Sequence, residues 1–93
     1  MHELIDTLER FRAIKQQDVV VLNDDNARKR YHHADCRHLD ERNFIQKLSG
    51  TGGANGRYFL VSEPSDASVP EGSICGTCRE EVLRLRAARP RVS

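Results

Sequence analysis

Three cysteines, Cys36, Cys75 and Cys78, place the strongest constraint on how this chain can fold. A secreted domain held by disulfide bonds has an even number of cysteines, so the odd count favours a reduced compartment. Cys75 and Cys78 form a C-x2-C pair, the spacing at which a tight turn points two thiolates at one metal ion. We therefore expect metal ligation, rather than disulfide bonding, at these residues.

A second pair of ligands lies upstream, in a segment rich in histidine. Three residues separate His32 from Cys36, two separate His33 from Cys36, and either spacing lets both side chains reach one ion. Three sulfurs and one nitrogen complete a tetrahedral shell that zinc favours, with no position left for a catalytic water. We predict a structural Zn²⁺ bound by the four residues His32, Cys36, Cys75 and Cys78, with His33 as the alternative nitrogen ligand.

Buried apolar thiols or a redox C-x-x-C are the other interpretation of these cysteines. Redox motifs of this kind follow the first strand of a thioredoxin-like βαβ pattern, which this sequence lacks. Metal ligation is therefore the stronger prediction.

The chain has 93 residues, which predicts one domain over 1–93. Aromatic residues make up only 5% of it, so its core is thin and a metal ion would support the fold. We predict an α+β fold, with a short antiparallel sheet stapled by zinc and flanked by N- and C-terminal helices. The predicted parts are an amphipathic helix over 1–16, a zinc-binding module over 18–85 and a frayed tail over 89–93. After the first helix, composition predicts strands at 18–22, 27–32 and 58–62 and helices at 39–48 and 77–88.

The N-terminal helix carries an apolar stripe that includes Leu4, Leu8 and Phe11. This stripe either covers the open face of the small sheet or binds a partner, which could be a second copy of the chain in a homodimer. Charges throughout 1–17 argue against a signal peptide, and the longest apolar run, at 19–22, is far too short to span a membrane. We expect a soluble, cytoplasmic protein.

The sequence YHHADCR at 31–37, followed by GSICGTCR at 72–79, resembles the zinc-binding domain of the Ada methylphosphotriester-repair family. The resemblance implies a zinc-stapled scaffold of strands and a helix over about 19–85. It also implies a nucleic-acid-binding regulator, and the basic residues Arg84, Arg86 and Arg89 are the contacts we expect in that case. His32 stands where the family has its methyl-accepting cysteine, so the repair chemistry itself does not carry over.

Size, arginine-rich composition and the lack of catalytic apparatus are also similar to the small early lytic proteins of mycobacterial phages of the Fruitloop type. This resemblance implies a phage protein acting in the host cytoplasm, where it binds a DivIVA-type polar-growth scaffold and excludes superinfecting phage. The balance of 15 basic and 14 acidic residues, with a net charge of +1, gives no general attraction to nucleic acid and is compatible with a protein partner.

Two enzyme patterns can be compared with the sequence. His33, His38 and Asn43 suggest an HNH nuclease, but no histidine follows His38 to complete its catalytic metal site. The alternative is that His33 and His38 are exposed or orient the zinc ligands. The glycine-rich segment at 50–56 lacks the lysine of a phosphate-binding loop and should be mobile. We therefore predict a non-enzymatic, zinc-stabilised protein-binding module.

Overall fold

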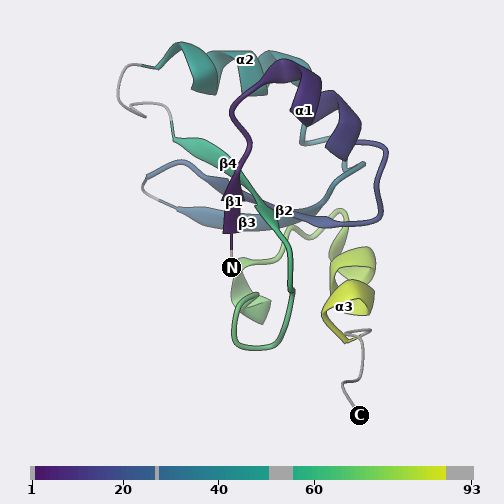
Figure 1. Cartoon of the computed structure of the whole chain (residues 1–93). Helices are drawn as coiled ribbons and strands as arrows, with labels where there is room; N and C mark the ends of the chain where they lie inside the picture. The colour runs from purple at the N-terminus through teal and green to yellow at the C-terminus, as the bar shows by residue number, and fades with distance from the viewer. Residues whose placement is uncertain (1, 27, 51–55, 88–93) are drawn as a thin grey trace.

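A four-stranded antiparallel sheet organises the chain in the computed structural model, which describes residues 2–26, 28–50 and 56–87 (Figure 1). The strand order is β1-β4-β2-β3. The strands are β1 (His2–Leu4), β2 (Val20–Asp24), β3 (Lys29–His33) and β4 (Arg57–Val61). The helices of the described residues are α1 (Leu8–Ile14), α2 (Glu41–Ser49), α3 (Arg79–Ala87) and a short 3-10 helix, η2 (Glu71–Ser73). The predicted α+β class, with helices flanking an antiparallel sheet, is confirmed.

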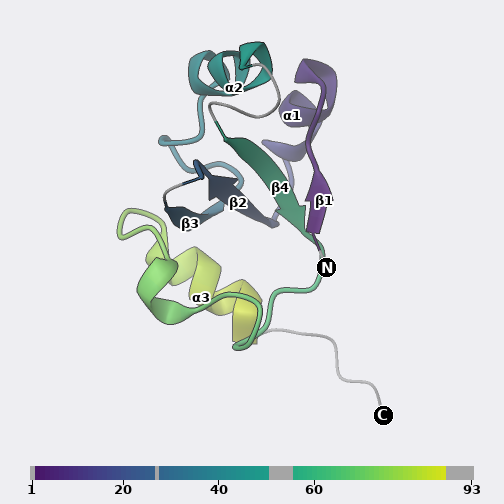
Figure 2. The same cartoon turned by 90° about the vertical axis from the view of Figure 1, so that its left-hand side faces the viewer.

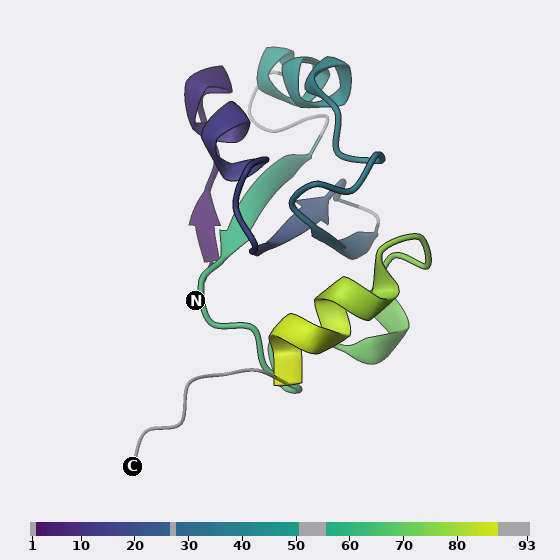
Figure 3. The same cartoon turned by 90° about the vertical axis from the view of Figure 1, so that its right-hand side faces the viewer.

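The helices lie on both faces of the sheet. Figures 2 and 3 show α1 and α2 together over one face and α3 against the other, beneath β3. Between the sheet and the first two helices, the rings of Phe11, Phe44 and Tyr58 are stacked. The Phe11 and Phe44 centroids are 4.5 Å apart, and Phe44 and Tyr58 are 6.0 Å apart. Each ring comes from a different element, so this stack joins α1, α2 and β4 in one core.

The first residues correct the prediction of a helix over 1–16. His2–Leu4 form the edge strand β1, paired with β4, and the Ile5 N–H continues this pairing by donating to the Tyr58 carbonyl at 3.0 Å. The helix begins only after Thr7, whose hydroxyl accepts from the Arg10 N–H at 3.1 Å. Pairing with β4 satisfies the backbone of the first residues, and Thr7 is a favourable N-cap, so the helix starts there.

The apolar stripe of this segment also differs from its prediction. Phe11 is only 2% exposed because it lies in the ring stack, and Leu8 is half-buried against the same core. Leu4 alone of the three is exposed, on the edge strand. Phe11 and Leu8 therefore pack over the sheet while Leu4 stays exposed, and the expectation that Phe11 is available to a partner is wrong.

The remaining elements lie within a few residues of their predicted bounds. Asn23 and Asp24 stay in the β2–β3 ladder, opposite Arg30 and Lys29, although residues of their type favour turns. The reversal follows them, where the Asp25 N–H donates to the Arg28 carbonyl at 3.1 Å. The predicted tail at 89–93, with Arg89, lies outside the described residues, as does most of the predicted glycine-rich loop.

Candidate metal centre

The first pair of candidate ligands comes from the end of β3. His32 lies on this strand opposite Val21 of β2. The chain turns directly afterwards, with the Cys36 N–H donating to the His33 carbonyl at 2.9 Å. This turn brings Cys36 back beside the strand, so that the two side chains lie close together despite the three residues between them.

The second pair is docked onto the outer edge of the same strand. Ile74 forms a parallel bridge with Tyr31, and the Cys75 N–H donates to the Tyr31 carbonyl at 2.9 Å. Cys78 stands directly before α3, and its carbonyl accepts from the Val82 N–H at 3.1 Å in the first helical turn. Backbone pairing with β3 and the start of α3 therefore fix the two ends of the C-x2-C turn.

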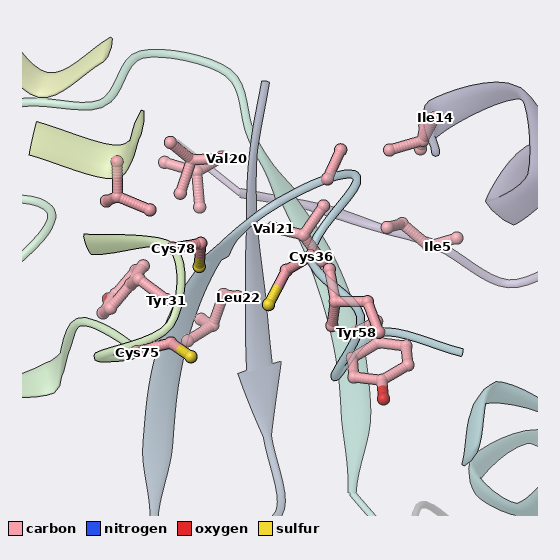
Figure 4. Close-up of a cluster of buried hydrophobic side chains, with 14 of the residues drawn as sticks. Ile5, Ile14, Val20, Val21, Leu22, Tyr31, Cys36, Tyr58, Cys75 and Cys78 are labelled. Carbon is pink, nitrogen blue, oxygen red and sulfur yellow. The ribbon is translucent and has the colours of Figure 1, made fainter. Parts of the chain in front are cut away.

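The four side chains form one compact, buried cluster. One ligand atom from each of His32, Cys36, Cys75 and Cys78 lies within 4.8 Å of all the others. In tetrahedral zinc sites, ligand atoms are separated by about 3.5 to 4 Å, so small side-chain rotations would complete the shell. Figure 4 shows the sulfurs of the three cysteines lying near one another beside β3. The cysteines form no disulfide bond, and the cluster could hold a metal ion.

The pKa values of the three thiols are shifted in different directions. Burial raises the pKa of Cys78 to about 12 and also raises the pKa of Cys36. Burial acts in the same direction on Cys75, but the backbone N–H groups of Thr77 and Cys78 outweigh it and lower the pKa of that thiol. Three adjacent buried thiolates are unfavourable without a cation, so the cluster is suited to a positive ion.

His32 has the chemical state that a metal ligand requires. Burial, with the nearby cationic or ionisable groups of His38, Arg30 and Lys15, lowers the pKa of His32 to about 4, so the ring is neutral near pH 7. Its Nδ1 is buried and has no hydrogen-bond partner among the described residues. A metal ion is a natural partner for such a nitrogen. The donor set of three sulfurs and one imidazole nitrogen fits zinc.

His33, the alternative nitrogen ligand in the sequence prediction, lies elsewhere. Its Nδ1 is 2.7 Å from an Asp35 oxygen, and its Nε2 is 2.7 Å from an Asp18 oxygen. Both ring nitrogens therefore face carboxylates, and His33 is not part of the four-residue cluster. The structure favours His32 as the nitrogen ligand.

The residues of the nuclease pattern have three different environments. His33 lies between Asp18 and Asp35, whereas the His38 ring contacts the Thr77 hydroxyl at 3.0 Å. Asn43 lies in the first turn of α2, where its N–H donates to the Asp40 carboxylate. The two histidine rings thus have partners within the protein, and the Asn43 backbone belongs to the capped first turn of α2.

The basic residues predicted for nucleic-acid contact are engaged within the protein. Arg84 pairs with Asp18 through two hydrogen bonds, of 2.6 and 3.1 Å. Arg86 pairs with Asp66 at 3.2 Å and donates to the Val69 carbonyl at 3.1 Å. These contacts attach α3 to the rest of the fold, and Arg89 lies outside the described residues.

Two neighbours of the centre were not predicted from sequence. Lys15, after α1, donates from its Nζ to the Cys36 carbonyl at 2.9 Å. Asp18, in the segment before β2, contacts both His33 and Arg84. No short motif marks either residue, because their partners are a backbone carbonyl in one case and distant side chains in the other.

The chain was compared with models of protein families, with curated proteins and with solved structures. No match supports either the Ada resemblance or the phage resemblance, because none of the three comparisons finds a protein similar to this chain.

Proposed function

We propose that this chain is a zinc-stabilised, non-enzymatic module that binds a protein partner in the cytoplasm. The buried cluster of His32, Cys36, Cys75 and Cys78 carries the proposal. Four protein ligands fill the tetrahedral shell of Zn²⁺, so the ion would have a structural role with no open position for substrate. The thiolates would stay reduced in that compartment.

The ion would add a cross-link between β3 and the segment leading into α3, which also meet through the Tyr31–Ile74 bridge and the hydrogen bond from the Cys75 N–H to the Tyr31 carbonyl. His32 belongs to β3 and Cys36 to the turn after it, whereas Cys75 and Cys78 precede α3. Bound zinc contributes roughly 10 to 16 kcal/mol to the folding of zinc-finger peptides. A contribution of that size would hold α3 against the sheet in a chain whose core is small.

Metal uptake tests the structural part of this proposal. We expect the purified protein to bind one equivalent of Zn²⁺, and the Co²⁺ form to show the intense visible and near-ultraviolet absorption of a tetrahedral thiolate site. Cys75→Ser should lose tight binding because only three ligands remain. His2→Ala, at an exposed histidine of β1 outside the cluster, is the control and should retain it. A wild-type chain that takes up neither ion would refute the proposal.

An exposed apolar patch supports the protein-binding part. We define the patch as Leu4, Ile45 and Leu48, which are 39%, 50% and 47% exposed. Leu4 and Leu48 line one pocket of about 150 Å³ together with Phe44 and Tyr58, and Ile45 lies one turn before Leu48 on α2. Exposed apolar side chains around a small pocket are suited to contact with a partner's apolar side chain.

A DivIVA-type polar-growth scaffold is the first partner to test, because the phage resemblance implies it. We expect the purified scaffold to bind the immobilised chain, and Leu48→Asp to weaken binding at least tenfold. Gln16→Asp adds the same charge at an exposed position and should bind like the wild type. Equal binding by both variants would exclude the patch, and no binding by the wild type would exclude this partner.

The same preparation can test the alternative functions. Because Arg84 and Arg86 are held by Asp18 and Asp66, we expect no binding to duplex DNA at moderate salt and no nicking of plasmid with added divalent metals. A salt-dependent DNA shift lost on replacing Arg84 and Arg86 would instead favour the nucleic-acid regulator.

Across the described residues, no helix combines the length and apolar character needed to cross a bilayer.

A further inference from the structure

A buried histidine and an exposed carboxylate connect the candidate metal centre to α3. His33 is 6% exposed, and its ring lies between Asp18 and Asp35, with a nitrogen 2.7 Å from an oxygen of each. With a carboxylate oxygen beside each ring nitrogen, turning the ring would break both contacts. The side chain of His33 is therefore fixed on the face of β3 opposite His32.

Asp18 also binds the helix that follows the C-x2-C turn. Its carboxylate receives two hydrogen bonds from the Arg84 guanidinium, at 2.6 and 3.1 Å. Those bonds, with the one to His33, lower the pKa of Asp18 to about 2, so the carboxylate stays ionised in neutral solution. One charged group thus contacts both β3 and α3.

The same two elements meet again at a ligand sulfur. The backbone N–H of His33 donates to Cys78 Sγ at 3.2 Å. Cys78 lies directly before α3, the helix that Asp18 contacts through Arg84, and His33 is the neighbour of His32. A displacement of α3 relative to β3 would therefore change the position of Cys78 relative to both His32 and the donating N–H.

We propose that Asp18 is a positioning residue for the metal centre. By binding His33 and Arg84 together, it holds β3 and α3 in the arrangement in which His32 and Cys78 face the same ion. This inference rests on the proposed zinc-stabilised function and assigns to His33 the orientation of the site rather than ligation. Partners that hydrogen-bond directly to a ligand typically change metal affinity by about 10- to 100-fold when they are removed. Asp18 acts one contact further out, through His33 and Arg84, so the lower end of that range is expected.

The exposure of Asp18 limits how much its ion pair with Arg84 can add to stability. Its side chain is 58% exposed, and isolated surface ion pairs add little to stability. The bidentate geometry and the shared buried partner distinguish Asp18 from such a pair. An ion pair of similar exposure lies between α1 and α2, where Arg12 donates to Glu41 at 2.8 and 3.0 Å without contacting the cluster. It is the natural control.

The test compares Asp18→Asn with Glu41→Gln in the full chain. Affinity is measured for Zn²⁺ by competition with a chelator, and the absorption of the Co²⁺ form is recorded at saturating metal. We expect Asp18→Asn to weaken Zn²⁺ binding about tenfold, the lower end of the range for direct partners of ligands, and to shift the Co²⁺ bands, because Cys78 changes position. Glu41→Gln should leave the bands unchanged and the affinity within about threefold. Asp18→Glu keeps a carboxylate and should recover most of the affinity.

Each result supports or overturns the positioning role of Asp18. Wild-type affinity in Asp18→Asn would overturn the positioning role while leaving the zinc-stabilised function intact. A loss equal to that of Glu41→Gln, with unchanged Co²⁺ bands, would show general destabilisation and also overturn it. A loss of binding so complete that no Co²⁺ spectrum forms would support the role only if Asp18→Glu restores both readouts, and would oppose it otherwise. A wild-type chain that binds neither ion would overturn both proposals.

Discussion

Two adjacent histidines have different surroundings because they lie on a strand. Successive side chains of a strand point to opposite faces, so His32 and His33 cannot both reach one ion from β3. His32 enters the cysteine cluster, whereas His33 contacts the carboxylates on the other side. Spacing from Cys36 alone left both residues open as ligands, and the strand's alternation distinguishes them.

The buried phenol of Tyr58 gives a pH-dependent prediction at this scale. Burial, with a smaller effect of the Asp40 carboxylate, raises the pKa of Tyr58 to about 12. The unfolded phenol ionises near pH 10, so between pH 10 and 12 the unfolded state loses a proton that the folded state retains. The contribution of this group to stability is therefore fully present below pH 10 and is lost as the pH rises toward 12.

Phenolate absorbance, followed together with unfolding, checks this prediction. Tyr58→Phe should remove part of the alkaline loss of stability, whereas Tyr31→Phe should keep the Tyr58 titration. Ionisation of both phenols near pH 10 in the folded protein would contradict the expected burial.

Stacked aromatic rings contribute to the packing of α1 and α2 on the sheet. Phe11 of α1 and Phe44 of α2 lie with their centroids 4.5 Å apart and an interplanar angle of 15°, and both are nearly fully buried. Helices as short as α1 and α2 are not stable alone. Their stability in the fold therefore depends on packing, to which this contact and Tyr58 contribute together with the buried Ile14 of α1.

Removal of one ring should accordingly have a large effect. We expect Phe44→Ala to lower the free energy of unfolding by about 3 to 5 kcal/mol, because it leaves a cavity between α1, α2 and β4. Urea denaturation of the metal-loaded protein measures this loss. Ile45→Ala, at the exposed neighbouring position, should change stability by less than about 1 kcal/mol. Equal effects of the two substitutions would contradict the described core.

At the scale of the whole molecule, the metal ion would link α3 to the sheet. The helices α1 and α2 lie over one face of the sheet, whereas α3 lies against the other (Figure 3). The contacts of α3 include the buried Val82, the half-buried Leu83 and Leu85, the ion pairs of Arg84 and Arg86, and the hydrogen bond from Arg86 to the Val69 carbonyl. Such contacts alone are modest for a helix of this size.

Chelation should therefore affect the molecule unevenly. We expect a strong zinc chelator to lower the melting temperature markedly and to raise amide hydrogen exchange first in α3 and in the C-x2-C turn. Added Zn²⁺ should reverse both changes. Cys36→Ala should reproduce the chelated state without added chelator. Unchanged melting, in a protein shown to have lost its metal, would contradict a structural role for the ion.

Local patterns predicted much of this structure and of its candidate site. The C-x2-C turn and the spacing of His32 from Cys36 are short-range features, so their pairing could be inferred from the residues alone. By contrast, β1 has only three residues and forms because β4, distant in sequence, offers it a hydrogen-bonding edge. The contacts of Asp18 with His33 and Arg84 are equally long-range. Such contacts leave no periodic signal, which is why sequence reasoning extended the first helix too far and did not identify Asp18.

The order of the ligands along the chain has a consequence for the kinetics of metal uptake. Between Cys36 and Cys75 the chain passes through α2 and β4, so an ion shared by both ligand pairs in the unfolded chain would close a long loop. Closing such a loop costs conformational entropy that no other contact yet offsets. The ligand pairs should therefore converge only after β4 has paired with β2 of the β2–β3 hairpin. The slow step of metal uptake would then be formation of the sheet, and its rate should not depend on zinc concentration once zinc is in excess.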